Sequence, residues 1–260
     1  MKKSKWLVAL FVSVVALTGC GKTENVKEVF ATAEKKMDAL SNFTMKMEMN
    51  IGVKSSGVEM TIPTTIETKM DVKSKTSKMN MSVEMMGMKL STEGYTQTVD
   101  GKVITYTKEM MGDTWTKEIS DDDDSNDVLS IAEHAKKIEK KKSDDKAANC
   151  YQLTISKEDM TALLGTMGAD SVEEYQIEKD VVIDAYIDKE SNYITKIVMD
   201  LKDVMTVEED VELTSATITI TIYDFDKVGT ITIPEEVIQN AQEEAEGNDW
   251  NFDDEDDLEM

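Results

Sequence analysis

The sequence predicts an α+β fold in which helices accompany an antiparallel sheet with one apolar face. Two observations support this prediction. Apolar and polar residues alternate with a period of two along several long runs between residues 43 and 225, as expected of strands with one face in water. One segment before these runs and another in the middle of the chain repeat their apolar residues at helical spacing instead.

The chain begins with a segment that has the order of a bacterial secretion signal. Three lysines precede a mostly apolar run at residues 6–17, and small residues follow it. This run is too short to span a bilayer, which takes about 20 residues. Residues 17–20 have the sequence Leu-Thr-Gly-Cys and closely resemble the lipobox of bacterial lipoproteins. The resemblance implies that residues 1–19 are a signal peptide, that Cys20 carries a diacylglycerol thioether, and that residues 20–24 form a lipidated tether.

A helix and three long strands are predicted after the tether. The apolar residues of the helix share one face at 3.6-residue spacing and are Val26, Val29, Phe30, Ala33, Met37 and Leu40. From Phe43 the period changes to two. The apolar strand positions are Phe43, Met45, Met47, Met49, Ile51 and Val53, then Val58, Met60, Ile62, Ile66, Met70 and Val72, then Met79, Met81, Val83 and Met85.

Two short turns are predicted next. The alternation changes phase around Gly87, which indicates a hairpin turn or a bulge, since a slip of one residue exchanges the two faces of a strand. Asp100-Gly101 is a strong hairpin signal between the predicted strands 95–99 and 103–108. Five or six antiparallel strands therefore follow one another along the first half of the chain.

The second half is predicted to begin with a helix. Its acidic start at residues 121–126 leads to an apolar side that carries Val128, Ile131, Ala135 and Ile138. A strand at 151–155, a short helix from Ser156 and three strands at 176–187, 193–205 and 211–225 follow. Pro234 can open a last helical turn.

One domain over residues 25–240 is predicted, followed by a disordered tail at 241–260. No linker or repeat divides the first range. The second carries ten acidic residues and no lysine, a composition that cannot support a packed core.

Composition excludes one class of partner. The formal net charge is −24 and the chain contains no arginine, whereas proteins that bind nucleic acids neutralise phosphates with lysine and arginine. We therefore expect no nucleic-acid partner, and we expect attachment to the membrane to depend on the lipid at Cys20. With Cys20 lipidated, Cys150 has no partner for a disulfide and is expected to be a small buried residue.

The order of these features resembles the bacterial lipoprotein carrier superfamily. A lipobox, an amphipathic helix, a long meander of strands, a helical interruption and a return to strands are shared with LolA and LolB, with mycobacterial LppX and LprG, and with uncharacterised Gram-positive lipoproteins of this type. The resemblance covers roughly residues 25–235 and is one of pattern, without a short diagnostic motif. It implies a strongly bent, unclosed antiparallel barrel or sheet, with the N-terminal helix and further helices over its apolar face and a cavity for acyl chains between them.

Methionines gather on the predicted apolar face. Twelve of the nineteen methionines lie between Met45 and Met111, and this flexible side chain can repack around different apolar guests. We predict a non-catalytic lipoprotein, exported to the outer face of the cell membrane, that encloses a lipid or another hydrophobic ligand between sheet and helices. The candidate lining residues are Phe43, Met45, Met47, Met49, Met60, Ile62, Met79, Met81 and Val83 from the strands and Val29, Phe30 and Met37 from the helix.

Two alternatives use the same residues differently. In the first, the sheet is fully packed, and the protein is a structural or adhesion-type surface module that binds a protein or a wall polymer. In the second, the Met-rich motifs Met45-x-Met47-x-Met49 and Met85-Met86-x-Met88 bind copper, because thioethers select Cu(I). Isoleucine, valine and phenylalanine are mixed among these methionines, which a metal cluster would not need.

No catalytic, metal or cofactor site is predicted. His134 is the only histidine, and neither a Gly-x-Ser-x-Gly elbow nor a phosphate-binding glycine loop occurs. The acidic run at 122–133 matches several positions of an EF-hand loop, but Asp127 stands where that loop needs glycine. We therefore expect this run to be a solvated helix start.

Overall fold

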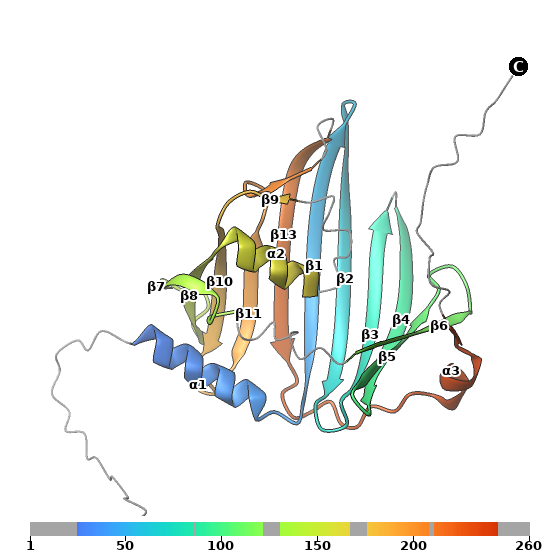
Figure 1. The fold of residues 1–260 in the computed structure, drawn as a ribbon. Helices are drawn as coiled ribbons and strands as arrows, with labels where there is room; N and C mark the ends of the chain where they lie inside the picture. Colours follow the sequence, from blue (N-terminus) through green and yellow to red (C-terminus); the bar gives the residue numbers. More distant parts are fainter. Residues whose placement is uncertain (1–24, 86, 122–130, 167–175, 208–210, 244–260) are drawn as a thin grey trace, which may run out of the picture.

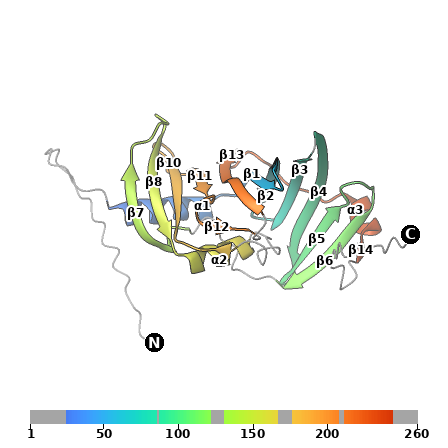
Figure 2. The same ribbon diagram turned by 90° about the horizontal axis from the view of Figure 1, so that it is seen from above.

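The computed structural model describes residues 25–85, 87–121, 131–166, 176–207 and 211–243 (Figure 1). Its main feature is a twelve-stranded sheet that curves strongly without closing (Figure 2). Neighbouring strands in this sheet are antiparallel except for one short pair at an edge. The predicted unclosed antiparallel sheet is therefore present. The predicted signal peptide, Cys20 and most of the predicted acidic tail lie outside the described residues.

The first half of the chain is a helix followed by a meander of strands, in which each strand pairs with the next. The elements are α1 (Val26–Asp38), β1 (Asn42–Ser55), β2 (Val58–Asp71), β3 (Thr76–Met85), β4 (Met88–Val99), β5 (Lys102–Lys108) and β6 (Trp115–Asp121). Gly87 has φ +76° in the turn between β3 and β4, and Asp100 and Gly101 both have positive φ between β4 and β5. Both predicted turns are confirmed.

The second half completes the sheet from the other side. Its elements are β7 (Ala135–Lys141), β8 (Ala148–Ile155), α2 (Lys157–Thr166), β9 (Gln176–Ile177), β10 (Val181–Asp188), β11 (Ile194–Asp200), β12 (Met205–Thr206), β13 (Val211–Tyr223), α3 (Glu235–Asn240) and β14 (Gln242–Glu243). The strand order is β14-β6-β5-β4-β3-β2-β1-β13-β11-β10-β8-β7, while β9 and β12 form a separate small pair. β13 thus joins the two halves of the chain by pairing with β1 on one side and β11 on the other.

The helix predicted around residues 128–138 is wrong over its described part. Residues 135–141 form β7, the edge strand of the sheet, and Ile138 lies opposite Leu153 of β8. An edge strand has one neighbour and is often protected by lysines, so β7 shows little of the alternation that marks a strand. Ile131 and Ile138 have the spacing of residues on one helix face, but they belong to different elements. Ile131 lies in the turn before β7 and is buried in the core, whereas Ile138 lies within β7.

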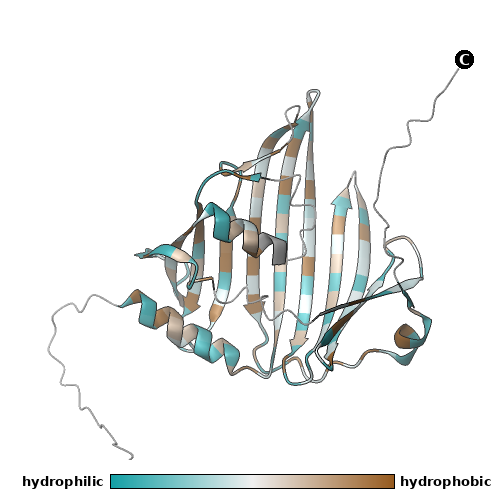
Figure 3. Ribbon diagram, in the orientation of Figure 1, coloured by the Kyte–Doolittle hydropathy of each residue, from teal (hydrophilic) through white to brown (hydrophobic). Residues whose placement is uncertain are grey.

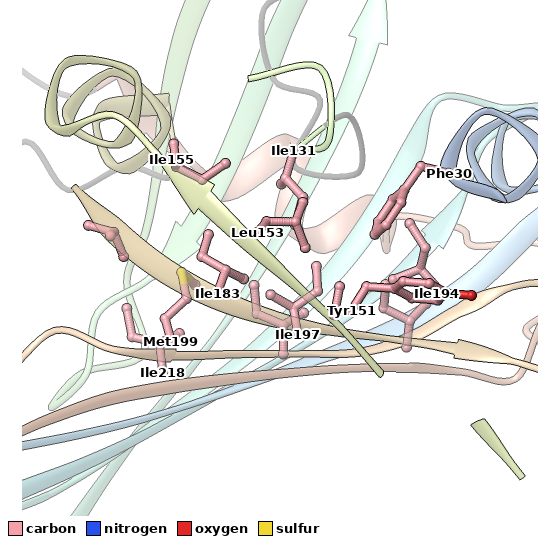
Figure 4. Packing of buried hydrophobic residues seen from close by; sticks show 14 of the residues in the cluster. Phe30, Ile131, Tyr151, Leu153, Ile155, Ile183, Ile194, Ile197, Met199 and Ile218 are labelled. Atoms are coloured by element: carbon pink, nitrogen blue, oxygen red, sulfur yellow. The ribbon is translucent and has the colours of Figure 1, made fainter. Parts of the chain in front are cut away.

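The main hydrophobic core fills one half of the inner face, which we define as the face that carries Met47, Ile220 and Leu153 and around which the sheet curves (Figure 2). Helices α1 and α2 lie on this face over β8 to β13. The ring of Phe30 meets the ring of Tyr151 edge-on, with centroids 5.5 Å apart (Figure 4). These contacts close the core over the second half of the chain.

A smaller core lies on the outer face, under α3. Tyr95, Tyr106, Ile233 and Val237 are buried there, with Trp115 packed against them. Tyr95 of β4 lies opposite Lys78 of β3, whereas its neighbour Gly94 lies opposite Met79. The apolar side of the sheet therefore changes from the inner face in β1–β3 to the outer face in β4–β6.

The described helices cover only part of the predicted apolar face. α1 has its main sheet contacts with β7 and β11, and the main strand contact of α2 is with β9. Covering helices over the apolar residues of β2 and β3 are not found among the described elements. None of the helices in the described ranges has the length and apolar character that crossing a membrane requires.

Candidate functional site

The predicted strand residues of the site lie together on the inner face. Met47 of β1 lies opposite Ile66 of β2, and Ile66 lies opposite Met81 of β3. Hydrophobic residues recur along β13, β1 and β2 in this region (Figure 3). We call this surface the methionine floor; it consists of Met45, Met47, Met49, Met60, Ile62, Ile66, Met79, Met81 and Val83.

Only part of the methionine floor packs against the buried core. Phe43, at the start of β1, belongs to the buried core, and Met45, Met47 and Met49 pack partly buried against that core. The floor residues of β2 and β3, among them Met60, Ile62, Met79, Met81 and Val83, are half-buried and lie outside both buried clusters. The floor is thus a half-buried apolar surface that begins at the packed core in β1 and continues beyond that core in β2 and β3.

The predicted helical residues lie elsewhere. Phe30 and Met37 of α1 are buried in the main core, and Val29 packs beside them. Phe30 meets the ring of Tyr151 on β8, and Val29 lines the same surface pocket as Tyr151, away from the floor residues of β2 and β3. The structure therefore separates the predicted set into core residues from α1 and surface residues from β1–β3.

The core between sheet and α2 leaves little free space. An apolar pocket lined by Ile131, Met160, Ile183, Met199 and Ile220 has a volume of about 20 Å³. A single water molecule needs about 10–15 Å³ of such space, so the pocket has room for about one water and none for an acyl chain. Within the described residues, the methionine floor is therefore the candidate surface for a hydrophobic ligand.

A polar surface that the sequence reasoning missed borders the floor. The inner face of β4–β6 carries mainly hydroxyl side chains, and we call it the hydroxyl wall. It consists of Thr92, Thr96, Thr98, Thr105, Thr107, Thr116 and Ser120, with Gly94, Val103 and Glu118 among them. The two-residue turn at Asp100-Gly101 fixes the register of β4 and β5 and was the signal that could have revealed this wall.

The outer face of β2–β5 holds an open polar groove of about 480 Å³. Both of its glutamates have partners: Lys78 Nζ lies 3.2 Å from Glu93 Oε2, and the hydroxyl of Tyr223 donates to Glu67 Oε2 at 2.9 Å. At the rim, the ammonium of Lys108 lowers the pKa of Asp113 from 2.9 Å away. Such pairing is typical of a solvated strand face.

The described residues offer no group of three His, Cys, Asp or Glu side chains that could hold a metal ion. His134 is exposed, with Nδ1 3.9 Å from Asp159 Oδ1. The predicted burial of Cys150 is confirmed, since the free thiol is 3% exposed.

Comparisons with known proteins bear on the family and the fold. A family model described as "Family of unknown function (DUF6612)" matches residues 25–242. A DUF1329 family protein from Desulfovibrio piger is similar in structure, with 11% identity, a TM-score of 0.32, and coverage of 82% of this chain and 97% of that chain. A β-barrel-like DUF1849 protein from Brucella abortus has 10% identity, a TM-score of 0.29, and coverage of 71% and 99%. No curated protein matches the sequence.

Proposed function

This chain belongs to the DUF6612 family, and since that family has no known function, we propose one from the sequence and structure: a membrane-anchored, non-catalytic lipoprotein that binds a lipid or another hydrophobic ligand on the inner face of its sheet. The observation that carries the proposal is the methionine floor. Its β2 and β3 residues are half-buried, although the neighbouring half of the same face is closed by helices.

The chemistry of the floor suits an apolar guest. Each half-buried methionine or isoleucine that a ligand covers contributes roughly 25 cal/mol for every Å² removed from water. Methionine adapts its conformation to the guest, so the floor can accept chains of different shape. Transfer of an acyl chain from a bilayer to this floor exchanges one apolar environment for another, and binding is therefore reversible.

Export and anchoring complete the proposal. The lipobox-like sequence at residues 17–20 supports cleavage before Cys20 and lipidation of its thiol. α1 begins at Val26, so the tether between the lipid and the fold is short and holds the sheet close to the outer face of the cell membrane. The order of elements supports the resemblance to the lipoprotein carrier superfamily, in which such a sheet carries acyl chains.

Native mass spectrometry of protein starting at Gly21, purified without detergent, tests the binding. We expect lipid at close to one molecule per protein. Met81→Asp should abolish this lipid, because the new carboxylate lies in the middle of the floor. The matched control is Ser82→Asp, the next residue of β3, which points to the outer groove and should leave the lipid bound.

Circular dichroism must show both variants folded for the comparison to count. Folded wild-type protein that carries no lipid and takes up no added fatty acid or phospholipid would contradict the proposal and favour the packed, protein-binding module. Separately, Cys20→Ser should release the protein from the membrane fraction and prevent metabolic labelling with palmitate. Retention of the label in this variant would refute lipidation at Cys20, and absence of label from the wild-type protein would refute the lipid anchor; neither result bears on the floor.

A further inference from the structure

The hydroxyl wall differs from the solvated strand faces of the same protein. The outer face of β2 and β3 carries many charges, among them Glu59, Glu67, Lys69, Lys78 and Glu84. The wall has the same strand geometry but only one charged residue, Glu118. Since charged residues make up 32% of this chain, a strand surface that merely faces water would be expected to carry more of them.

Several hydroxyls of the wall are available to a ligand. Thr96 and Thr105 lie directly opposite each other on β4 and β5 and are half-buried, as is Thr98. Within the described part of the chain their hydroxyl groups have no hydrogen-bond partner, whereas the hydroxyl of Thr116 donates to the carbonyl of Thr107 at 3.3 Å. Hydroxyl groups can both donate and accept, so the free ones can bind other hydroxyls.

The wall and the methionine floor are continuous. Met81 of the floor lies opposite Thr92 of the wall, and the terminal methyl of Met79 reaches Gly94, where an added Cβ would lie only 3.2 Å from it. Adjacent strands are about 4.8 Å apart, so the centre of the floor and the Thr96–Thr105 pair are separated by about 10 to 15 Å. One amphiphile can therefore cover both surfaces.

The charge of the wall limits the headgroup. None of its residues is a lysine that could pair with a phosphate, and the carboxylate of Glu118, opposite Thr105, would repel an anion. A neutral headgroup with hydroxyls can donate to Glu118 and exchange hydrogen bonds with the threonines. We propose that the floor and wall together bind an amphiphile whose headgroup is uncharged and bears hydroxyls, as the sugar of a neutral glycolipid does. This inference depends on the proposed function, because it assigns the polar end of the same ligand.

Competition between lipids with identical acyl chains tests the inference. Protein starting at Gly21 is loaded with a fluorescent fatty acid, which is then displaced by diglucosyl diacylglycerol, by phosphatidylglycerol or by diacylglycerol. We expect the glycolipid to displace the probe at a concentration about tenfold lower than either of the other two lipids, the equivalent of one or two net hydrogen bonds.

The double variant Thr96→Val/Thr105→Val removes two hydroxyls and keeps the side-chain shape. It should abolish the preference by lowering the affinity for the glycolipid about tenfold, to that of diacylglycerol, whose single hydroxyl gains far less from the wall. The matched control is Thr61→Val/Thr65→Val on the outer face of β2, which should keep the preference. Equal or tighter binding of phosphatidylglycerol, or a preference that survives the double variant, would overturn the inference and leave lipid binding intact. Failure of the protein to bind the probe or any of the three lipids would refute the proposed function itself.

Discussion

At the scale of single residues, Tyr223 and Glu67 form the best-defined polar contact on the outer face. The phenol donates to the carboxylate at 2.9 Å. Burial, and then this hydrogen bond to a negative group, raise the pKa of Tyr223 to about 12, against an ordinary value near 10. The folded protein thus holds the phenol protonated where the unfolded chain ionises it. The resulting stability is complete below about pH 10 and is lost as the pH rises toward 12.

Replacement of Tyr223 by phenylalanine should remove this part of the pH dependence. Wild-type protein is expected to lose more of its free energy of unfolding between pH 9 and 11.5 than Tyr223→Phe, as measured by urea denaturation at each pH. In the difference between their absorbance titrations at 295 nm, the missing phenol should ionise near pH 12. Tyr193→Phe, which removes a phenol but keeps the ring that stacks on Phe225, is the control. A difference titration centred near pH 10 would contradict the prediction.

Cys150 gives a second prediction at this scale. The thiol is buried on β8, and its pKa is raised first by desolvation and then by the charge of Asp184. A thiol that is both inaccessible and protonated reacts slowly. We expect reaction with Ellman's reagent at pH 8 to be at least about a hundredfold slower in the folded protein than in 6 M guanidinium. Rapid labelling without unfolding would show that the β7–β8 edge opens freely.

At the scale of elements, α3 covers the smaller hydrophobic core on the outer face of the sheet. Val237 is 3% exposed against the β4–β6 aromatics, whereas the next residue, Ile238, is 46% exposed. Val237→Asp should therefore open this cluster, because it places an unpaired charge in an apolar site. In a Trp250→Phe background with residues 1–19 absent, Trp115 is the only tryptophan, and its emission should shift to longer wavelength. Ile238→Asp should leave the emission unchanged; equal shifts in both variants would count against a specific α3 contact.

The elements also show what the sequence could and could not predict. β1–β3 were predictable because alternate residues such as Met45, Met47 and Met49 mark one apolar face. The helix predicted around Ile131 was not realised, because an edge strand such as β7 needs few apolar residues. After Gly87 the apolar side chains move from the inner to the outer face of the sheet. This change was predictable in principle from the two tight turns, because their registers place Tyr95 and Met79 on opposite faces. It was missed because one apolar face was assumed for the whole sheet.

At the scale of the whole molecule, two cores lie on opposite faces of one sheet, and the methionine floor lies between them. Strands β10, β11 and β13 are covered by the main core, whereas the inner residues of β2 and β3 are half-buried. Hydrogen exchange should therefore be slowest in β10, β11 and β13 and faster in β2 and β3. Addition of a bound lipid should slow exchange in β2–β5 more than in β8–β11. Uniform protection without lipid would indicate that the floor is as firmly packed as the core.

The candidate site was predictable only on its strand side. Local alternation identified the residues of β1–β3, but the position of α1 depends on long-range pairing that no local pattern contains. β13 enters the sheet beside β1, so β8 and α1 are placed beyond β13 and Phe30 meets Tyr151. The helix that precedes β1 in the sequence thus packs beside β11 and β8, which lie on the other side of β13 from β2 and β3.

The position of β13 also sets the order in which the fold can be completed. β1 pairs with residues 211–223, so its second neighbour is synthesised only after most of the chain. A chain synthesised from its amino end presents β1–β3 to water before that partner arrives. Until then β1 is an open edge strand whose methionines lack their core, a state prone to aggregation. Fragments that end before Val211 should for this reason fail to accumulate as soluble protein, and folding of the whole chain should be slow for its length.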